Sequence, residues 1–203
     1  MRINLAQKIS TKRTKILKPL SKEIQSHLDD LGFKQNNFEI NIETLNEPEA
    51  KSLYPTGMDK IEFMFSPNPG EPLKPLKSIA SSGELARVML GIKTVLASKD
   101  SIPLLVFDEV DANVGGETSS IVGEKLKAIG SNRQTICITH LAPVAAAADN
   151  HYLVEKNVSN GRTTSDVREL DKLSRNAEIA RMLGGTDAEI LEHAKALLKK
   201  AAQ

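Results

Sequence analysis

The sequence is poor in the residue types on which several kinds of protein depend. It has one cysteine, Cys137, so no disulfide can form within the chain, as is typical of a reducing compartment. Tryptophan is absent and aromatic residues make up 3% of the chain, which leaves little for a base-stacking surface. No apolar run approaches the roughly 18 residues of a membrane span, and the first residues lack a signal-peptide core. We therefore expect a soluble, cytoplasmic chain.

An excess of charge of one sign is also missing. The 203 residues carry 27 Lys and Arg against 26 Asp and Glu, which excludes a uniformly basic nucleic-acid coat and an acidic disordered tail. The balance hides a basic segment, because residues 1–22 contain seven basic side chains and no acidic one. This segment is either a phosphate-binding arm or one helix of a coiled coil without its acidic partner. Apolar residues recur along it at helical spacing, which favours the coiled-coil helix.

The spacing of apolar residues predicts an α/β chain. The first helix is expected to end at Gly32 and to be kinked or split at Pro19. Further helices are predicted at 85–96, 118–129, 174–183 and 187–202. Half-buried strands are predicted at 38–43 and 61–65, short buried strands at 104–107 and 135–139, and a hairpin at 151–158 and 163–167 around a turn at 160–161.

Two of the short strands end in residues that can carry chemistry. Asp108 and Glu109 follow one strand, and His140 follows the other. A helix between two strands makes them parallel, and parallel strands end at one edge of the sheet, where open α/β sheets bind ligands. An apolar strand followed by Asp-Glu is the Walker B pattern, in which the Asp holds Mg²⁺ and the Glu polarises the attacking water. The alternative is that the two acids only cap the next turn.

The helix predicted at 85–96 begins with a sequence that has two interpretations. Ser81 and Glu84 have the spacing of a capping box, which satisfies backbone amides at the start of a helix. The same start, with its hydroxyls and Gly83, is also an anion-binding pattern, because free amides and the helix dipole face a ligand there.

Taken in order, these motifs resemble the C-terminal half of an ABC-type ATPase head. Residues 80–84 are similar to the signature motif, 104–109 to Walker B and 138–140 to the switch histidine, while 111–116 occupy the D-loop position. A finer resemblance, to the RecN family of bacterial DNA repair proteins, which are relatives of the SMC proteins, covers nearly the whole chain. The stretches that carry it are 57–63, 66–71, 79–90, 107–111, 138–141 and 178–185. The Asn-Pro-Gly-Glu turn and the Arg-Met-Leu-Gly-Gly tail favour this family over other ABC ATPases.

The resemblance implies half of an ATP-hydrolysing head that acts in DNA double-strand-break repair and recombination. It implies that residues 1–31 end the returning helix of a coiled coil and that residues 32–203 are the C-terminal lobe. The implied ligands are ATP and Mg²⁺. The implied partners are an N-terminal P-loop lobe, a second head in a homodimer bridged by ATP, and DNA, with no membrane, in the cytoplasm at the nucleoid.

The resemblance also assigns roles to individual residues. Glu109 is the implied catalytic base, Asp108 the Mg²⁺ anchor and His140 the sensor of the γ-phosphate. The residues implied to contact ATP are Ser81, Ser82, Gly83, Glu84 and Asp111.

The sequence departs from the family pattern at several positions. It contains no Gly-x-x-x-x-Gly-Lys-Ser/Thr, so the chain alone is expected to bind ATP weakly and to hydrolyse it negligibly. Ser82 stands where a Gly is usual, Ala86 where a Ser is usual, and residues 141–143 read Leu-Ala-Pro in place of Leu-Pro-Gln. A non-catalytic assembly lobe, another SMC-like head and a transporter nucleotide-binding subunit stay open as alternatives.

Other reactive side chains give no site. The three remaining histidines have no acidic or cysteine neighbours at ligand spacing, which disfavours a zinc site. Cys137 and His140 are separated by three residues on an expected strand and so point to opposite faces, which disfavours a Cys-His dyad. We expect Cys137 to be a small buried residue.

Overall fold

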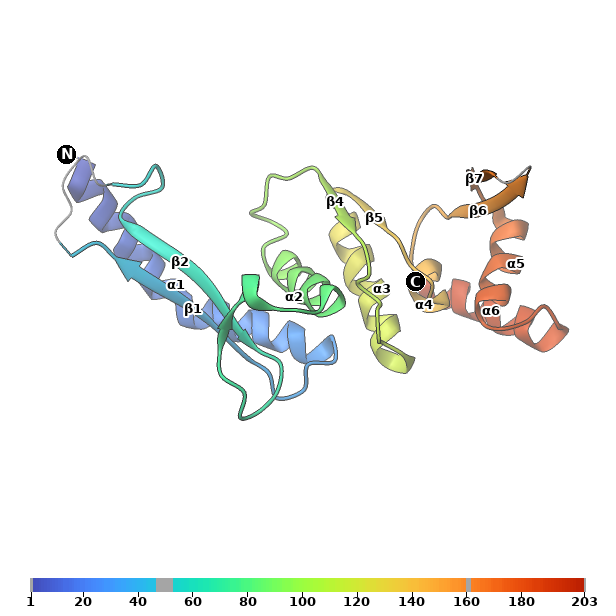
Figure 1. Ribbon diagram of the computed structural model, residues 1–203, viewed down its shortest axis with the longest axis horizontal. Coiled ribbons are helices and arrows are strands. Elements are labelled where there is room, and N and C mark those ends of the chain that lie inside the picture. Colours follow the sequence, from blue (N-terminus) through green and yellow to red (C-terminus); the bar gives the residue numbers. More distant parts are fainter. Residues whose placement is uncertain (1, 47–52, 160–161, 203) are drawn as a thin grey trace. The chain divides into compact units, whose positions relative to one another are not determined.

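The computed structural model describes residues 2–46, 53–159 and 162–202, so the turn predicted at 160–161 lies outside the described residues (Figure 1). The chain forms two compact units, residues 1–100 and residues 101–203. Among the described residues, no helix combines the length and the apolar character that a membrane crossing requires.

The first unit is a long helix packed on an antiparallel sheet and on a second helix. Its elements are α1 (Arg2–Asp30), β1 (Asn37–Thr44), β2 (Asp59–Ser66), β3 (Lys74–Pro75), a 3₁₀ turn η1 (Leu76–Ser78) and α2 (Ser82–Val95). The sheet order is β1-β2-β3, and α1 packs against both β1 and α2. The predicted helices and strands are confirmed, although α2 begins three residues before the predicted start.

The α1 helix is continuous, so the predicted split at Pro19 is wrong. Ile24 and Leu28 are fully buried beyond the proline and Ala6 is buried before it, and this packing offsets the lost backbone hydrogen bond. The helix ends as predicted at Gly32, which has a φ of +92°. The Gly32 amide donates to Asp29 O at 3.2 Å and the Phe33 amide to Leu28 O at 3.1 Å, which is a Schellman cap.

Close packing at a glycine joins α2 to α1. A Cβ built on Gly91 would lie 2.8 Å from Leu28 Cδ2, so only glycine lets the helices approach this far. Near the start of α2, the buried Arg87 guanidinium stacks over the Phe33 ring at 5.0 Å, and Phe33 meets the edge of Phe65 at 5.2 Å between centroids. Through Phe33, the N-terminal part of α2 is thus connected both to the segment that follows α1 and to β2 of the sheet.

A buried ion pair fixes the N-terminal half of α1 to the β1–β2 hairpin. Arg13 Nη1 lies 2.9 Å from Asp59 Oδ2, and the Asp59 side chain is fully buried. The same guanidinium donates to Thr56 O at 2.9 Å, while the Thr44 hydroxyl donates to Asp59 Oδ1 at 3.0 Å.

The second unit combines a two-stranded parallel sheet, a two-stranded antiparallel ribbon and four helices. Its elements are β4 (Leu104–Phe107), α3 (Gly116–Gly130), β5 (Gln134–Cys137), α4 (Ala142–Ala146), β6 (Tyr152–Ser159), β7 (Arg162–Glu169), α5 (Lys172–Met182) and α6 (Ala188–Ala201). The pairing of β4 with β5 is parallel, as predicted, with Phe107 opposite Cys137. The residues Val122, Leu126 and Ile129 form the buried face of α3, also as predicted.

One face of the β4–β5 sheet is bare, which corrects the prediction of two buried strands. Val106 and Ile138 are each 59% exposed, and Leu104 and Ile136 are also exposed. Side chains alternate along a strand, so these four residues share one face, while Phe107 points to the other face and is buried. An apolar face of this kind is normally covered by another structural element.

The β6–β7 ribbon is similarly two-faced. Val154 pairs with Val167, and the period of two places Tyr152 and Val158 on the same side; all four are exposed. The opposite side is polar and includes the pair between Arg168 Nε and Glu155 Oε2 at 3.0 Å. The side of the ribbon that carries the valines also carries Lys156 and Glu169, so it is an exposed surface of mixed apolar and charged side chains.

Two motifs that favoured the family have local structural roles. The Asn-Pro-Gly-Glu turn closes through the Ser66 hydroxyl, which bonds Asn68 O and Glu71 O, and through Gly70 at a φ of +82°. At the end of α5, Gly184 has a φ of +106°, and a Cβ on Gly185 would lie 2.6 Å from Ile190 Cδ1. The paired glycines thus allow the tight turn between α5 and α6.

The buried Asp59 predicts how stability depends on pH. Burial raises the pKa of Asp59, but hydrogen bonds from Ser10, Arg13 and Thr44 outweigh it and leave the pKa below its usual value of about 4. A carboxylate whose pKa is lowered by folding stabilises the fold above about pH 4 and loses this effect as pH falls through the folded-state pKa. Because Arg13 is 24% exposed, we expect Asp59→Asn to lower the free energy of unfolding by about 2 kcal/mol at pH 7.

Urea unfolding at pH 7, 5 and 3 measures this effect. The difference between the parent and Asp59→Asn should shrink below pH 4, and a constant difference would contradict the assignment. Glu43→Gln is the control, because the Lys60–Glu43 pair is exposed at 4.0 Å and is expected to contribute little.

The contact at Gly91 predicts a second effect on stability. Alanine favours a helix interior by about 1 kcal/mol over glycine, yet Gly91→Ala should destabilise the chain by about 1 kcal/mol because Leu28 must move. Gly130→Ala should be neutral or stabilising, since its Cβ would meet only Thr135 Oγ1 at 4.0 Å. Thermal unfolding of both variants checks this, and equal effects would show that the close approach has no energetic weight.

Candidate functional site

The carboxyl edge of the β4–β5 sheet carries the residues that the sequence singles out. Asp108 and Glu109 directly follow β4, and their side chains are exposed. The pairing continues one residue past β5, where the Ile138 amide donates to Phe107 O at 2.9 Å, and His140 follows two residues later. The sheet therefore brings two carboxylates and an imidazole to one edge, as predicted.

Glu109 has an unusual backbone conformation. Its φ is +57°, in the left-handed region that non-glycine residues rarely occupy. The Ala112 amide donates to Glu109 O at 3.0 Å, so the chain turns sharply immediately after β4. Conformations of this kind cost free energy and gather at functional sites, where the surrounding structure holds them.

A buried carboxylate, Asp111, joins the two loops of this edge. Asp111 is 2% exposed, and its Oδ2 accepts hydrogen bonds from the Thr139 hydroxyl and, at 3.1 Å, from the His140 amide. The Thr139 oxygen in turn accepts from the Leu141 amide at 3.0 Å. The loop after β4 and the loop after β5 are thus linked through one carboxylate oxygen.

The imidazole of His140 is positioned by the same carboxylate. Its Nδ1 lies 3.5 Å from Asp111 Oδ2, while 72% of the side chain is exposed. One side of the ring is therefore oriented by Asp111, and the rest of the ring is open to a ligand at the edge.

Cys137 is half-buried, where the sequence predicted a buried residue. Burial, followed by the nearby charges of Asp111 and Asp108, raises the pKa of its thiol to about 12. The thiolate is the nucleophilic form, so Cys137 is not a nucleophile at neutral pH. This agrees with the rejection of a Cys-His dyad.

The signature-like residues lie in the first unit, at the start of α2. Ser81 is the N-cap, and its hydroxyl accepts from the Glu84 amide at 3.4 Å, so the capping interpretation is confirmed. Ser82 is exposed on the first turn and Gly83 is buried. Capping and anion binding use the same helix start and are compatible, because a single cap satisfies only one of the free amides.

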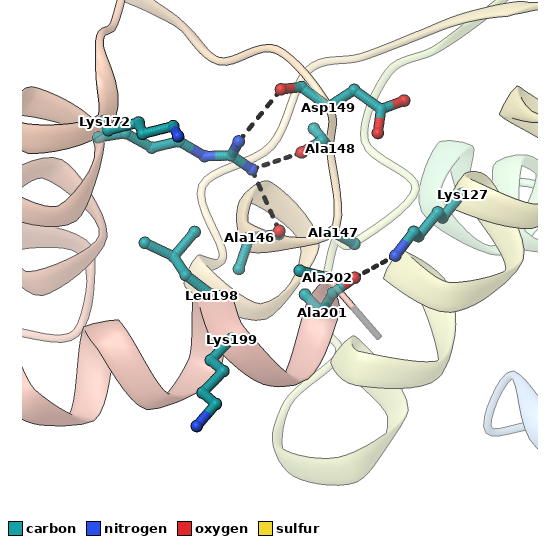
Figure 2. A pocket seen from close by; sticks show the side chains of 11 residues that line it. Lys127, Ala146, Ala147, Ala148, Asp149, Lys172, Leu198, Lys199, Ala201 and Ala202 are labelled. Carbon is teal, nitrogen blue, oxygen red and sulfur yellow. Dashed lines mark hydrogen bonds between the residues drawn. The ribbon is translucent and has the colours of Figure 1, made fainter.

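A cavity of about 560 Å³ elsewhere in the second unit is lined by basic residues but does not belong to this edge. Figure 2 shows Lys127 reaching the carbonyl of Ala201, the last residue of α6. Arg175 donates to the carbonyls of Ala146 and Ala148 at the end of α4. Lys127 and Arg175 therefore bind carbonyl groups at the C-terminal ends of helices, and their presence in the cavity does not require a ligand.

The chemistry of the candidate edge fits Mg²⁺ only with further ligands. No group of three or more metal-ligating side chains occurs in the described parts of the chain. Mg²⁺, however, keeps several waters and is usually bound through one or two carboxylates plus phosphate oxygens of a substrate. The exposed carboxylate of Asp108 suits that mode of binding.

The link through Asp111 and Thr139 is the part of the edge that sequence reasoning missed. It joins residues 28 positions apart, and Asp111 was assigned to ATP rather than to the switch loop. The only signal was a threonine before the histidine at a strand end, which does not by itself indicate a partner.

The link predicts a local effect of substitution. Asp111→Ala removes the acceptor of the Thr139 hydroxyl and the His140 amide, so we expect hydrogen exchange of the His140 amide to accelerate at least tenfold. Loss of two hydrogen bonds to a buried carboxylate should also lower the free energy of unfolding by about 2 kcal/mol. Asp108→Ala is the control, and equal exchange in both variants would rule out the link.

Comparison with known proteins gives a consistent result. No protein-family model matches the chain. The DNA repair protein RecN of Treponema pallidum is 41% identical over 204 residues, which cover 99% of this chain and 36% of that protein. RecN of Deinococcus radiodurans is 42% identical over 197 residues, covering 97% and 34%, and RecN of Bacillus subtilis 39% over 210 residues, covering 98% and 36%.

Among solved structures, the Smc head domain of Pyrococcus yayanosii, determined with a coiled coil and joint, matches with a TM-score of 0.52 and 21% identity. The match covers 91% of this chain and 29% of that one, and it shows the fold of an SMC-type head. The chain spans about a third of the length of the curated relatives that it matches. Its sequence similarity over nearly all of its residues establishes that the chain belongs to the RecN family, as a segment with the fold of an SMC-type head lobe.

Proposed function

We propose that this chain is the C-terminal lobe of a RecN-like ATPase head that acts in DNA double-strand-break repair and recombination, in the cytoplasm at the nucleoid. The observation that carries the proposal is the shared edge of β4 and β5, where Asp108, Glu109 and His140 come together. Parallel strands that end in these residue types suit hydrolysis of a phosphoanhydride.

Each residue at the edge has a role that follows from its position. Glu109 is exposed immediately after β4, so its carboxylate is accessible to the attacking water, which it would orient and polarise. Asp108 holds Mg²⁺, which neutralises charge on the phosphates when it is bound. His140 contacts the γ-phosphate through the part of its imidazole that faces away from Asp111.

The bare apolar face of β4–β5 supports a partner lobe. Four exposed aliphatic side chains lie together on one face of a two-stranded parallel sheet, and exposed apolar patches of this kind mark interaction sites. The ABC-type heads that this chain resembles carry the P-loop in their other lobe, and the sequence of this chain contains no P-loop motif. We infer that the P-loop lobe covers this face and brings the nucleotide to the edge.

The start of α2 suits the ATP of a second head. The exposed Ser82 hydroxyl and the Gly83 amide would donate to phosphate oxygens, while Ser81 and Glu84, whose amide donates to the Ser81 hydroxyl, would hold the helix start beside the nucleotide. ATP bound by the P-loop lobe of one head would then contact α2 of the other, so that ATP binding joins two heads and hydrolysis releases them. Asp111 supports this arrangement from inside, by positioning the switch loop.

The comparisons bear on two of the alternatives. Identity of about 40% to RecN proteins, against 21% to an Smc head, favours the RecN family over another SMC-like head and over a transporter subunit. A non-catalytic assembly lobe remains the competing function, because Ser82 replaces the usual glycine and the bare apolar face of β4–β5 suits assembly as such.

Reconstitution with the P-loop lobe tests the proposal. Glu109→Gln should lower ATP hydrolysis at least 100-fold, because the amide does not accept a proton from the attacking water, while ATP-dependent dimerisation persists. Glu117→Gln, at an exposed position in the first turn of α3, is the matched control and should keep its activity.

Hydrolysis and dimerisation together separate the two functions. Unchanged turnover in Glu109→Gln would show that another group is the base. A parent head that dimerises with ATP but hydrolyses none would instead support the assembly lobe.

A further inference from the structure

Five lysines line one face of α1. Lys8, Lys12, Lys15, Lys18 and Lys22 follow one another at steps of four, three, three and four residues. At 3.6 residues per turn these steps keep all five within about 120° of the helix circumference and spread them along about 21 Å. All five side chains are exposed, and residues 1–22 contain no acidic side chain.

This lysine stripe points away from the rest of the first unit. The packed face of α1 is marked by the buried Ala6, Ile24 and Leu28 and by Arg13, which turns inward to Asp59. On the helical wheel the centre of the stripe lies about 180° from the centre of that face. The β1–β2 hairpin therefore cannot neutralise the stripe.

The stripe has no counter-charge within the described residues. None of its five lysines forms an ion pair or a side-chain hydrogen bond there, whereas Lys60, Lys77 and Lys93 all pair with carboxylates. Like charges three or four residues apart destabilise a helix by about 0.2–0.5 kcal/mol per pair, and the stripe contains four such pairs in succession. An ordinary solvated face mixes both signs and avoids this cost.

We propose that the lysine stripe of α1 binds the phosphate backbone of double-stranded DNA. Duplex DNA carries one charge per roughly 1.7 Å, so a face about 21 Å long meets about twelve phosphates, of which five lysines neutralise up to five. The stripe has no aromatic side chain for stacking on bases, so the contact is independent of sequence. The choice of DNA rests on the proposed repair function, whereas the surface itself rests on charge and geometry alone.

A coiled-coil partner would leave the stripe accessible. The exposed apolar residues Leu5 and Ile16 lie on one flank of the stripe, separated by eleven residues and hence nearly in line. A second helix would pack along that flank, where burial of apolar area stabilises it, and not over five adjacent ammonium groups. Two aliphatic side chains without an aromatic residue are also too few for firm insertion into an anionic membrane.

The test compares two variants of equal charge. In the first, all five stripe lysines are replaced by Gln. In the second, the five replaced lysines are also exposed and have no ion pair among the described residues: Lys34, Lys74, Lys99, Lys199 and Lys200. Binding of the 203-residue chain to a labelled 30-base-pair duplex is measured by fluorescence anisotropy between 50 and 300 mM NaCl, with circular dichroism to confirm folding.

The stripe variant should bind at least tenfold more weakly at 50 mM NaCl. The slope of log K against log salt should fall in magnitude by about 3 to 4, at 0.9 for each lost phosphate contact. The control variant should change the affinity less than threefold. Because the assay contains no ATP, its failure leaves the ATPase proposal untouched.

Three results would overturn the proposal. Equal losses in the two variants would show that only net charge matters. Absence of binding by the parent chain would exclude the surface. Undiminished DNA binding by the stripe variant, with loss of its binding to anionic phospholipid vesicles or to a polyglutamate peptide, would assign the stripe to another kind of partner.

Discussion

The bare face of the β4–β5 sheet is the constraint on which the rest of the second unit depends. Two parallel strands satisfy few of each other's backbone groups, and here one of their faces gains no apolar burial from the described chain. The strands nevertheless have to be held in register, because their ends position every candidate catalytic group of this unit. If a P-loop lobe docks on this face, as we propose, it would bury the exposed aliphatic residues and would also hold the strand ends that carry the candidate groups.

Asp111 gives the assembled edge its internal order. One buried carboxylate oxygen receives a hydroxyl from Thr139 and the amide of His140, and it lies beside the imidazole. The loop after β4 is thus connected to the histidine through Asp111. The predicted contact of Asp111 with ATP stays a prediction, and the structure adds the hydrogen bonds of Asp111 to Thr139 and His140.

Much of the fold follows from the sequence, because the spacing of apolar residues and the positions of glycine and proline are local properties of the chain. The period-two segments became β1 and β2, and Gly32 ended α1 through a cap that needs a positive φ. Of the kink or split predicted at Pro19, the split is wrong, because packing along 29 residues of helix outweighs a single proline, and that packing depends on the distant hairpin.

The sequence predicted which residues gather at the candidate edge, but it did not predict the hydrogen bonds between them. Strand–helix–strand order places Asp108, Glu109 and His140 together by topology alone. Which face of the sheet is covered, and that Asp111 turns inward to Thr139, depend on contacts between residues far apart in sequence. The lysine stripe was also predictable only in part. The count of charges indicated a basic segment at residues 1–22, but only the packed face of α1 shows that its lysines point outward.

The left-handed backbone at Glu109 has a consequence for how this chain would respond to selection in the laboratory. A residue with a Cβ in that conformation costs about 1 kcal/mol relative to glycine, and asparagine also tolerates it well. A screen for thermal resistance alone would therefore favour glycine or asparagine at position 109 and discard the carboxylate. The most heat-tolerant variants would therefore lose the carboxylate that we propose as the catalytic base.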